Sequence, residues 1–76
     1  MENIIFAVHT PNVNALKEFL ETEKDKLEEM AMMSDSRHPT YIKNIRGNNG
    51  TVLFDTNNRE YVSNLILPDN VIAKET

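Results

Sequence analysis

Three short runs of this sequence are apolar at every position, and they constrain the fold more than any other feature. They are residues 4–8 (Ile-Ile-Phe-Ala-Val), 52–54 (Val-Leu-Phe) and 65–67 (Leu-Ile-Leu). A strand with one face in water alternates apolar and polar residues, so a continuous apolar run predicts burial on both faces. Only one long helical segment is predicted, and one helix covers one face of a small sheet. The sequence therefore predicts that a partner covers the second face, most simply a second copy of the chain in a homodimer.

The length and composition of the chain set further limits. A single domain is predicted over residues 1–76, and a domain of this size buries only about 60% of its extended surface. There is no cysteine, so neither a disulfide nor a thiolate metal site adds stability, and self-association is the remaining common solution. The formal charge of −4 argues against a generally basic nucleic-acid-binding protein. The first apolar run is too short for a signal peptide or a membrane span, so we expect a small acidic protein of the cytoplasm with no membrane contact.

The best-defined element is a long amphipathic helix that ends near Met33. Thr10 and Pro11 predict its start, with a hydroxyl at the N-cap and a proline at the first helical position, where the missing N–H is not needed. Apolar residues recur at helical spacing on one face: Val13, Leu16, Leu20, Leu27 and Met30, with Phe19 and Ala31 beside them. The opposite face carries Lys17, Glu18, Glu21, Lys24, Asp25 and Glu28.

The length of this helix leaves two alternatives open. From Pro11 to Met33 it is about 34 Å long, whereas a strand of six or seven residues spans about 20 Å. Either the helix breaks near Thr22 or Glu23, or the end that carries the methionines projects beyond the sheet.

The remaining segments are predicted to be strands separated by turns. Ile4–His9 is the first strand, residues 40–46 the second, 51–55 the third and 60–67 the fourth. Residues 47–50 (Gly-Asn-Asn-Gly) form a tight turn that tolerates positive φ. Residues 56–59 form a second turn, and 71–76 are a tail that either pairs at a sheet edge or stays free. The predicted fold is α+β in the order β-α-β-β-β: a small four-stranded, largely antiparallel sheet, three of its strands in a meander, with one long amphipathic helix on one face.

A group of methionines near the end of the helix is the first candidate contact surface. Met30, Met32 and Met33 lie close together, and Leu27 precedes them by about one turn. Methionine is frequent in adaptable contact surfaces because its side chain is unbranched and polarisable. We predict that Leu27, Met30, Met32 and Met33 contact a partner protein or a second copy. The alternative is that Met30 belongs to the core and that the other two methionines are ordinary helix residues.

Charge is distributed unevenly along the chain. Residues 1–36 carry eight acids and three bases, whereas residues 37–76 carry four acids and five bases. The acidic helix is compatible with mimicry of nucleic-acid phosphates or with docking on a basic partner. Its interspersed lysines favour the simpler interpretation, a solvated helix face of mixed charge.

The segment between Arg37 and Arg46 is the second candidate contact surface. Arg37, Tyr41, Lys43 and Arg46 combine cations for phosphates with an aromatic ring for stacking, which is the composition of a small site for RNA or another single strand. Regular strand alternation, however, places Lys43 and Arg46 on opposite faces, and the net charge of the chain opposes binding at physiological salt. An RNA-binding regulator is therefore the alternative prediction and not the first.

Catalytic and metal-binding patterns are weak in this sequence. His9 and His38 stand alone, without His-x-x-x-His spacing or a cysteine, and the serines lack a Gly-x-Ser-x-Gly context. We predict no cofactor, no metal and no enzymatic activity. The first prediction for function is a small non-enzymatic interaction protein, a regulator or inhibitor of phage or bacterial type that binds a macromolecular partner.

Overall fold

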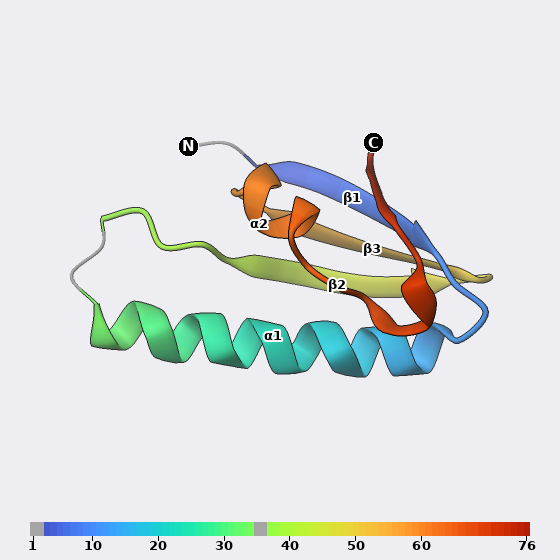
Figure 1. Ribbon diagram of the computed structural model, residues 1–76, viewed down its shortest axis with the longest axis horizontal. Helices are drawn as coiled ribbons and strands as arrows, with labels where there is room; N and C mark the ends of the chain where they lie inside the picture. Colours follow the sequence, from blue (N-terminus) through green and yellow to red (C-terminus); the bar gives the residue numbers. More distant parts are fainter. Residues whose placement is uncertain (1–2, 35–36) are drawn as a thin grey trace.

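The computed structural model describes residues 3–34 and 37–76, and it has an α+β fold (Figure 1). A four-stranded antiparallel sheet packs against one long helix, so the predicted fold class is confirmed. The elements in chain order are β1 (Ile4–His9), α1 (Val13–Met33), β2 (Ile42–Asn48), β3 (Thr51–Thr56), the short helix α2 (Arg59–Ser63), the 3₁₀ helix η1 (Pro68–Asn70) and β4 (Ala73–Glu75).

The first and last strands of the chain are neighbours in the sheet. The strand order is β2-β3-β1-β4, and each neighbouring pair is antiparallel. The predicted three-strand meander is wrong, because β1 and not a later strand lies on the far side of β3. The tail takes the first of its two alternatives, since Ala73–Glu75 pairs with β1 at the sheet edge.

Helix α1 begins two residues later than the sequence predicts. Its N-cap is Asn12, whose Oδ1 accepts a hydrogen bond from the Ala15 amide at 3.1 Å. Thr10, the predicted cap, accepts instead from the Asn12 amide through Oγ1 at 3.1 Å, and this contact belongs to the turn before the helix. Two good cap residues compete here, and asparagine caps at least as well as threonine.

The helix does not break at Thr22 or Glu23, and it is longer than the sheet that it covers. It is continuous over 21 residues, which corresponds to about 32 Å, in a molecule whose longest dimension is 38 Å. In Figure 1 the green end of α1 runs past the strands and lies beside the segment that leads into β2. The second alternative is therefore the observed one, and the methionine-bearing end projects.

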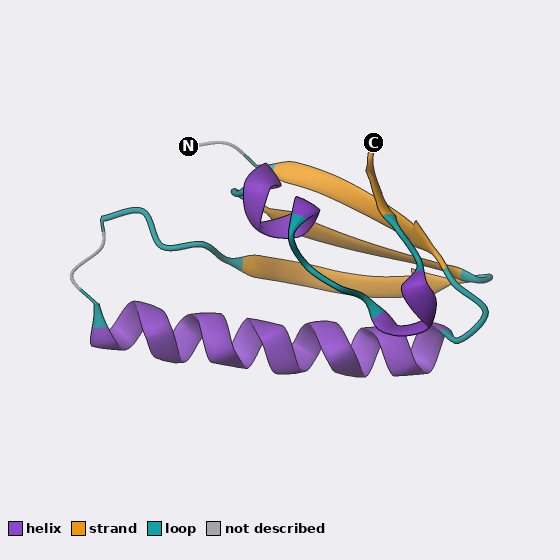
Figure 2. Ribbon diagram, in the orientation of Figure 1, coloured by secondary structure: helices purple, strands orange, loops and turns teal. Residues whose placement is uncertain are grey.

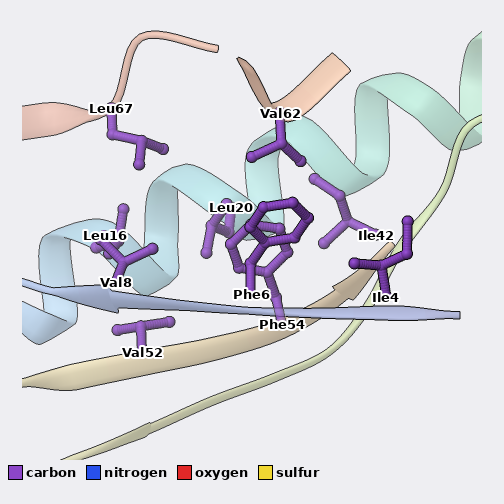
Figure 3. Close-up of a cluster of buried hydrophobic side chains, with 10 residues drawn as sticks. All are labelled: Ile4, Phe6, Val8, Leu16, Leu20, Ile42, Val52, Phe54, Val62 and Leu67. Carbon is purple, nitrogen blue, oxygen red and sulfur yellow. The ribbon is translucent and has the colours of Figure 1, made fainter. Parts of the chain in front are cut away.

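The core lies between one face of the sheet and the helices. Alternate residues of the central strands point to this side, together with residues one turn apart on α1. Figure 3 shows the buried side chains: Ile4, Phe6, Val8, Leu16, Leu20, Ile42, Val52, Phe54, Val62 and Leu67. The rings of Phe6 and Phe54 stack at the centre of this group, with centroids 5.8 Å apart. Full burial of side chains of this size contributes about 1.5–3 kcal/mol each.

The predicted fourth strand, residues 60–67, is not a strand. Its first half is the helix α2, because Oδ1 of Asn58 accepts from the Tyr61 amide at 2.9 Å and caps a helical turn. Its second half is an extended connection in which Leu67 is buried and Ile66 is exposed. Positive φ at Asp69 and Asn70, 61° and 55°, then reverses the chain toward β4. Figure 2 shows the two short purple helices of this connection between β3 and the C-terminal strand.

The two glycines have different roles, although the sequence pattern predicts one turn for both. Strand β2 continues through Gly47 to Asn48, and the turn itself is the pair Asn49 and Gly50, with φ of 48° and 80°. Positive φ at both central residues is typical of a type I′ hairpin turn. Gly47 lies against α1, where a Cβ atom would come within 2.6 Å of Cγ1 of Val13. It therefore allows β2 and the helix to approach closely.

Candidate functional site

The face of the sheet that points away from the core, here called the open face, is the first candidate surface. Paired residues of an antiparallel sheet share a face, so the register assigns to it Ile5, Ala7, His9, Lys43, Arg46, Asn48, Thr51, Leu53, Asp55 and Lys74. One row crosses all four strands in the order Arg46, Leu53, Ala7, Lys74. Cations end this row on both sides, and apolar side chains occupy its middle.

A β-bulge places Lys43 and Arg46 on the same face, which corrects the prediction that they lie on opposite faces. Lys43 pairs with Asp55 and Arg46 pairs with Leu53, so Asn44 and Ile45 lie opposite the single residue Phe54. Asn44 has a φ of 54°. The extra residue shifts the alternation by one position, and Ile45 packs against the core between the two cations.

Within residues 3–34 and 37–76, Asp55 is the one acidic residue of the open face. Its carboxylate accepts hydrogen bonds from three side chains. Asp55 is 5% exposed. Its oxygens accept from Asn44 Nδ2 at 2.9 Å, Asn3 Nδ2 at 3.2 Å and Arg46 Nη1 at 3.1 Å. The hydrogen bond from Asn44 is the largest cause that lowers the pKa of Asp55; burial opposes it, and Asn3 and Arg46 add to it. The carboxylate therefore stays ionised at neutral pH, and the Arg46 guanidinium balances its charge within the open face.

Tyr41 lies at the corner of the open face beside Asn3. Its hydroxyl donates to Asn3 Oδ1 at 3.1 Å, and Lys43 Nζ lies 5.0 Å from the centre of its ring. This distance is within the range of a cation–π contact. The structure thus brings together three of the four residues predicted to contact nucleic acid, namely Tyr41, Lys43 and Arg46.

Arg37, the fourth predicted residue, lies in the loop after α1 and outside the strand register. The structure adds two basic residues that the sequence did not indicate. Lys74 joins the open face because β4 pairs with β1. His9 lies opposite Thr51, and its Nδ1 is 2.9 Å from Thr51 Oγ1. Only the position of the tail identifies Lys74, since no local pattern around it predicts which strand it joins.

The solvent side of α1 carries the opposite charge. Glu18, Glu21, Asp25 and Glu28 follow one another at spacings of three and four residues, with Glu29 beside them, and all five are exposed. We call these five residues the acidic ridge. The lysines of the helix lie to its sides: Lys17 and Lys24 are half-buried, and Lys26 pairs with Glu23 at 3.3 Å. The helix surface is therefore more segregated in charge than the sequence indicates.

The projecting end of α1 forms the second candidate surface. A groove of about 410 Å³ separates it from the segment that leads into β2, and it is mostly apolar. Its lining comes from the helix, from residues 38–40 and from α2: Glu23, Lys26, Leu27, Met30, Ala31, Ser34, His38, Pro39, Thr40 and Tyr61. We call it the helix-end groove. It contains two of the four residues predicted to contact a partner, Leu27 and Met30.

A polar contact joins residues that line the helix-end groove. The hydroxyl of Tyr61 donates to Glu23 Oε1 at 2.6 Å, while Glu23 Oε2 accepts from Lys26 Nζ at 3.3 Å. Burial of the ring and the neighbouring carboxylate both raise the pKa of the Tyr61 hydroxyl. Glu23 is the polar residue that interrupts the apolar stripe of the helix, and this contact explains its position.

The three methionines at the helix end do not act as one patch. Met30 is 64% exposed and lines the groove, whereas Met32 and Met33 are each 87% exposed and lie outside its lining. Met33 follows Met30 by three residues, so it lies beside Met30 on the helix. Met32 follows Leu27 by five residues and points to the opposite side. The contact surface predicted as one cluster is therefore divided, and Met32 continues the acidic ridge.

The two histidines lie in different places, His9 on the open face and His38 in the helix-end groove. The described residues contain no group of three or more His, Cys, Asp or Glu side chains placed to hold a metal ion. None of the helices within the described residues is long and apolar enough to cross a membrane. Comparisons of this chain with known protein families, with curated proteins and with solved structures find no match.

Proposed function

We propose that this chain is a small non-enzymatic regulator or inhibitor, acting in the cytoplasm, that binds a partner protein through the projecting end of α1. One observation carries the proposal. The helix continues beyond its sheet and leaves Met30 and Met33 64% and 87% exposed beside the helix-end groove. Exposed apolar side chains next to an apolar depression are typical of protein interaction sites, and methionine adapts its shape to a partner.

The occupant that we propose is a basic segment of another protein with one large apolar side chain. The apolar lining of the helix-end groove, Leu27, Met30, Ala31 and Pro39, accepts that side chain. The acidic ridge lies on the opposite side of the same helix, so it attracts a basic partner at longer range and accelerates the encounter. A second copy of the chain brings an identical acidic ridge, and the two ridges repel each other.

Homodimerisation, which the sequence predicts, is the competing use of this surface. Two findings weaken its original basis. Residues 65–67 are not a strand, and Ala7 and Leu53 on the open face are already half-buried in the single chain. Light scattering at micromolar concentration separates the two cases. A homodimer has about twice the monomer mass of 8.7 kDa. A chain that binds a different protein has the monomer mass when it is alone.

The test compares two methionines of one helix end. Met30→Glu places a charge in the helix-end groove, where an apolar side chain of the partner leaves it unpaired. Met32→Glu adds the same charge to the opposite side of the same turn and is the matched control. We expect affinity capture from cell extract, read by mass spectrometry, to retain one protein with wild type and with Met32→Glu and to lose it with Met30→Glu. Equal retention by both variants, with melting temperatures near wild type, would contradict the proposal.

A further inference from the structure

We infer that the open face is a second binding surface, and that its ligand is a single strand of nucleic acid. The inference does not depend on the protein contact proposed for the helix end, because the two surfaces share no residue. It starts from charge segregation. Lys43, Arg46 and Lys74 lie on the open face, where Asp55, itself paired, is the one acid among the residues that the structure describes. The acidic ridge that makes the whole chain negative belongs to α1, on the other side of the sheet.

The geometry of the open face matches an anionic strand with exposed bases. Arg46 and Lys74 end the same row on β2 and β4, and three interstrand spacings place their backbones about 14 Å apart. Between them lie Leu53 and Ala7, with Ile5 beside them and 36% exposed. Cations at both ends contact phosphates of the strand, and the apolar middle contacts base faces. Bases of a duplex are stacked on one another, so this middle favours a single strand.

The bulge in β2 brings Arg46 onto the open face beside Lys43. Without the extra residue at Asn44, Arg46 would point into the core side of the sheet, where Gly47 now meets α1. Asn44 also donates to Asp55 at 2.9 Å, so the same residue re-aims Arg46 and holds the Asp55 carboxylate. Bulges are frequent where a functional side chain must be re-aimed.

A second copy of the chain is the competing ligand for this face, because its acidic ridge also carries negative charge. Two arguments favour nucleic acid. The ridge consists of carboxylates, with Met32 at one end, and so offers little apolar surface to Ile5, Ala7 and Leu53. A contact between the ridge of one copy and the open face of the next is also heterologous, so it leads to a ring or an open filament and not to the common twofold dimer. A symmetric contact between two open faces brings their cations together and is disfavoured.

The test uses fluorescence anisotropy with a labelled oligouridylate, the matching oligothymidylate and a duplex. We expect weak binding of both single strands, with a Kd of about 10⁻⁴ to 10⁻⁶ M, and weaker binding of the duplex. For a single strand, the logarithm of the binding constant falls with the logarithm of salt concentration by about 0.7 per contacted phosphate. Three cations therefore predict that affinity falls on the order of tenfold between about 50 and 200 mM salt. Lys43→Ala with Lys74→Ala should reduce the slope by roughly 1.4. Leu53→Ser should weaken binding without changing the slope, because it removes a base contact and no charge.

The matched control is Lys17→Ala with Lys24→Ala, which removes two cations from α1 and gives the same net charge. We expect it to bind like wild type. Equal loss in the two double variants would mean that only overall charge matters and would overturn the assignment of the face, as would absence of binding at low salt. Salt-dissociable oligomers in light scattering, lost in the variant with Lys43→Ala and Lys74→Ala, would identify a second copy as the ligand instead. Circular dichroism melting of each variant shows whether the fold is intact.

Discussion

Arg46 and Asp55 join β2 to β3 across the open face, with Nη1 of the arginine 3.1 Å from Oδ1 of the aspartate. The two residues are not opposite each other in the register, since Arg46 pairs with Leu53 and Asp55 with Lys43. Their contact depends on the bulge between Lys43 and Arg46. The pair therefore links a local irregularity of the backbone to the charge of the whole face.

Asp55 makes the stability of the protein sensitive to acid. Its pKa is lowered in the folded state, so the stabilisation is present above the unfolded value of about 3.9 and is lost as pH falls through the folded value. We expect Asp55→Asn to lower the free energy of unfolding by about 1–3 kcal/mol at pH 7, because it removes charged hydrogen bonds. The difference from wild type should shrink below about pH 4. Urea unfolding at several pH values measures this difference in the free energy of unfolding. Asp25→Asn, at an exposed carboxylate of α1, serves as the control. A difference that is the same at pH 3 and pH 7 would show that the Asp55 charge does not stabilise the fold.

Asn44 is predicted to combine two effects that substitutions can separate. Asn44→Gly keeps the positive φ accessible and removes only the hydrogen bond to Asp55, so we expect a loss of about 1–2 kcal/mol. Asn44→Val also places a β-branched residue at a φ of 54°, which adds about 1–3 kcal/mol of strain. Thermal melting of the two variants checks the order. If valine were tolerated as well as glycine, the bulge would not be the conformation in solution.

A side chain at Gly47 is predicted to destabilise the fold while Val13 faces it. Gly47→Ala places a Cβ about 2.6 Å from Cγ1 of Val13, and overpacking of this kind typically costs about 1–3 kcal/mol. Val13→Ala removes Cγ1, the atom that the new Cβ would contact. In a double-mutant cycle by chemical denaturation, we expect Gly47→Ala to cost less in the Val13→Ala background. Equal costs in the two backgrounds would mean that β2 and α1 do not approach closely at this point.

Gly50 is predicted to be required by the turn. Its φ is 80°, where valine is strained, so Gly50→Val should destabilise the protein by at least about 1 kcal/mol. Asn48→Val is the matched control, because Asn48 is an exposed strand residue two positions earlier and valine suits strands. We expect its melting temperature to stay near that of wild type. Equal melting temperatures for the two variants would mean that the turn is misplaced.

The elements that depend on local patterns could be predicted from the sequence. The apolar stripe from Val13 to Met30 specifies one long helix, because side chains three and four residues apart share a face. The pair Asn49 and Gly50 specifies the hairpin turn, because few residues accept positive φ at both positions. The apolar run of residues 4–8 likewise specifies a strand, because β-branched and aromatic residues favour strands. In each case the signal lies within a few residues of the structure that it determines.

The tertiary structure alone decided the fourth strand and the open face. Residues 60–67 and 71–76 both carried enough apolar residues for a strand, and the difference came from the Asn58 cap and from the free edge of β1, which lies almost the whole chain length away. The bulge at Asn44 likewise depends on Asp55 in the neighbouring strand. Strand pairing satisfies backbone groups of distant segments, and an extra residue is accepted only where the partner strand compensates for it. The bulge placed Lys43 and Arg46 on one face, and the pairing of β4 with β1 added Lys74 to it. No pattern within a single segment contains this arrangement.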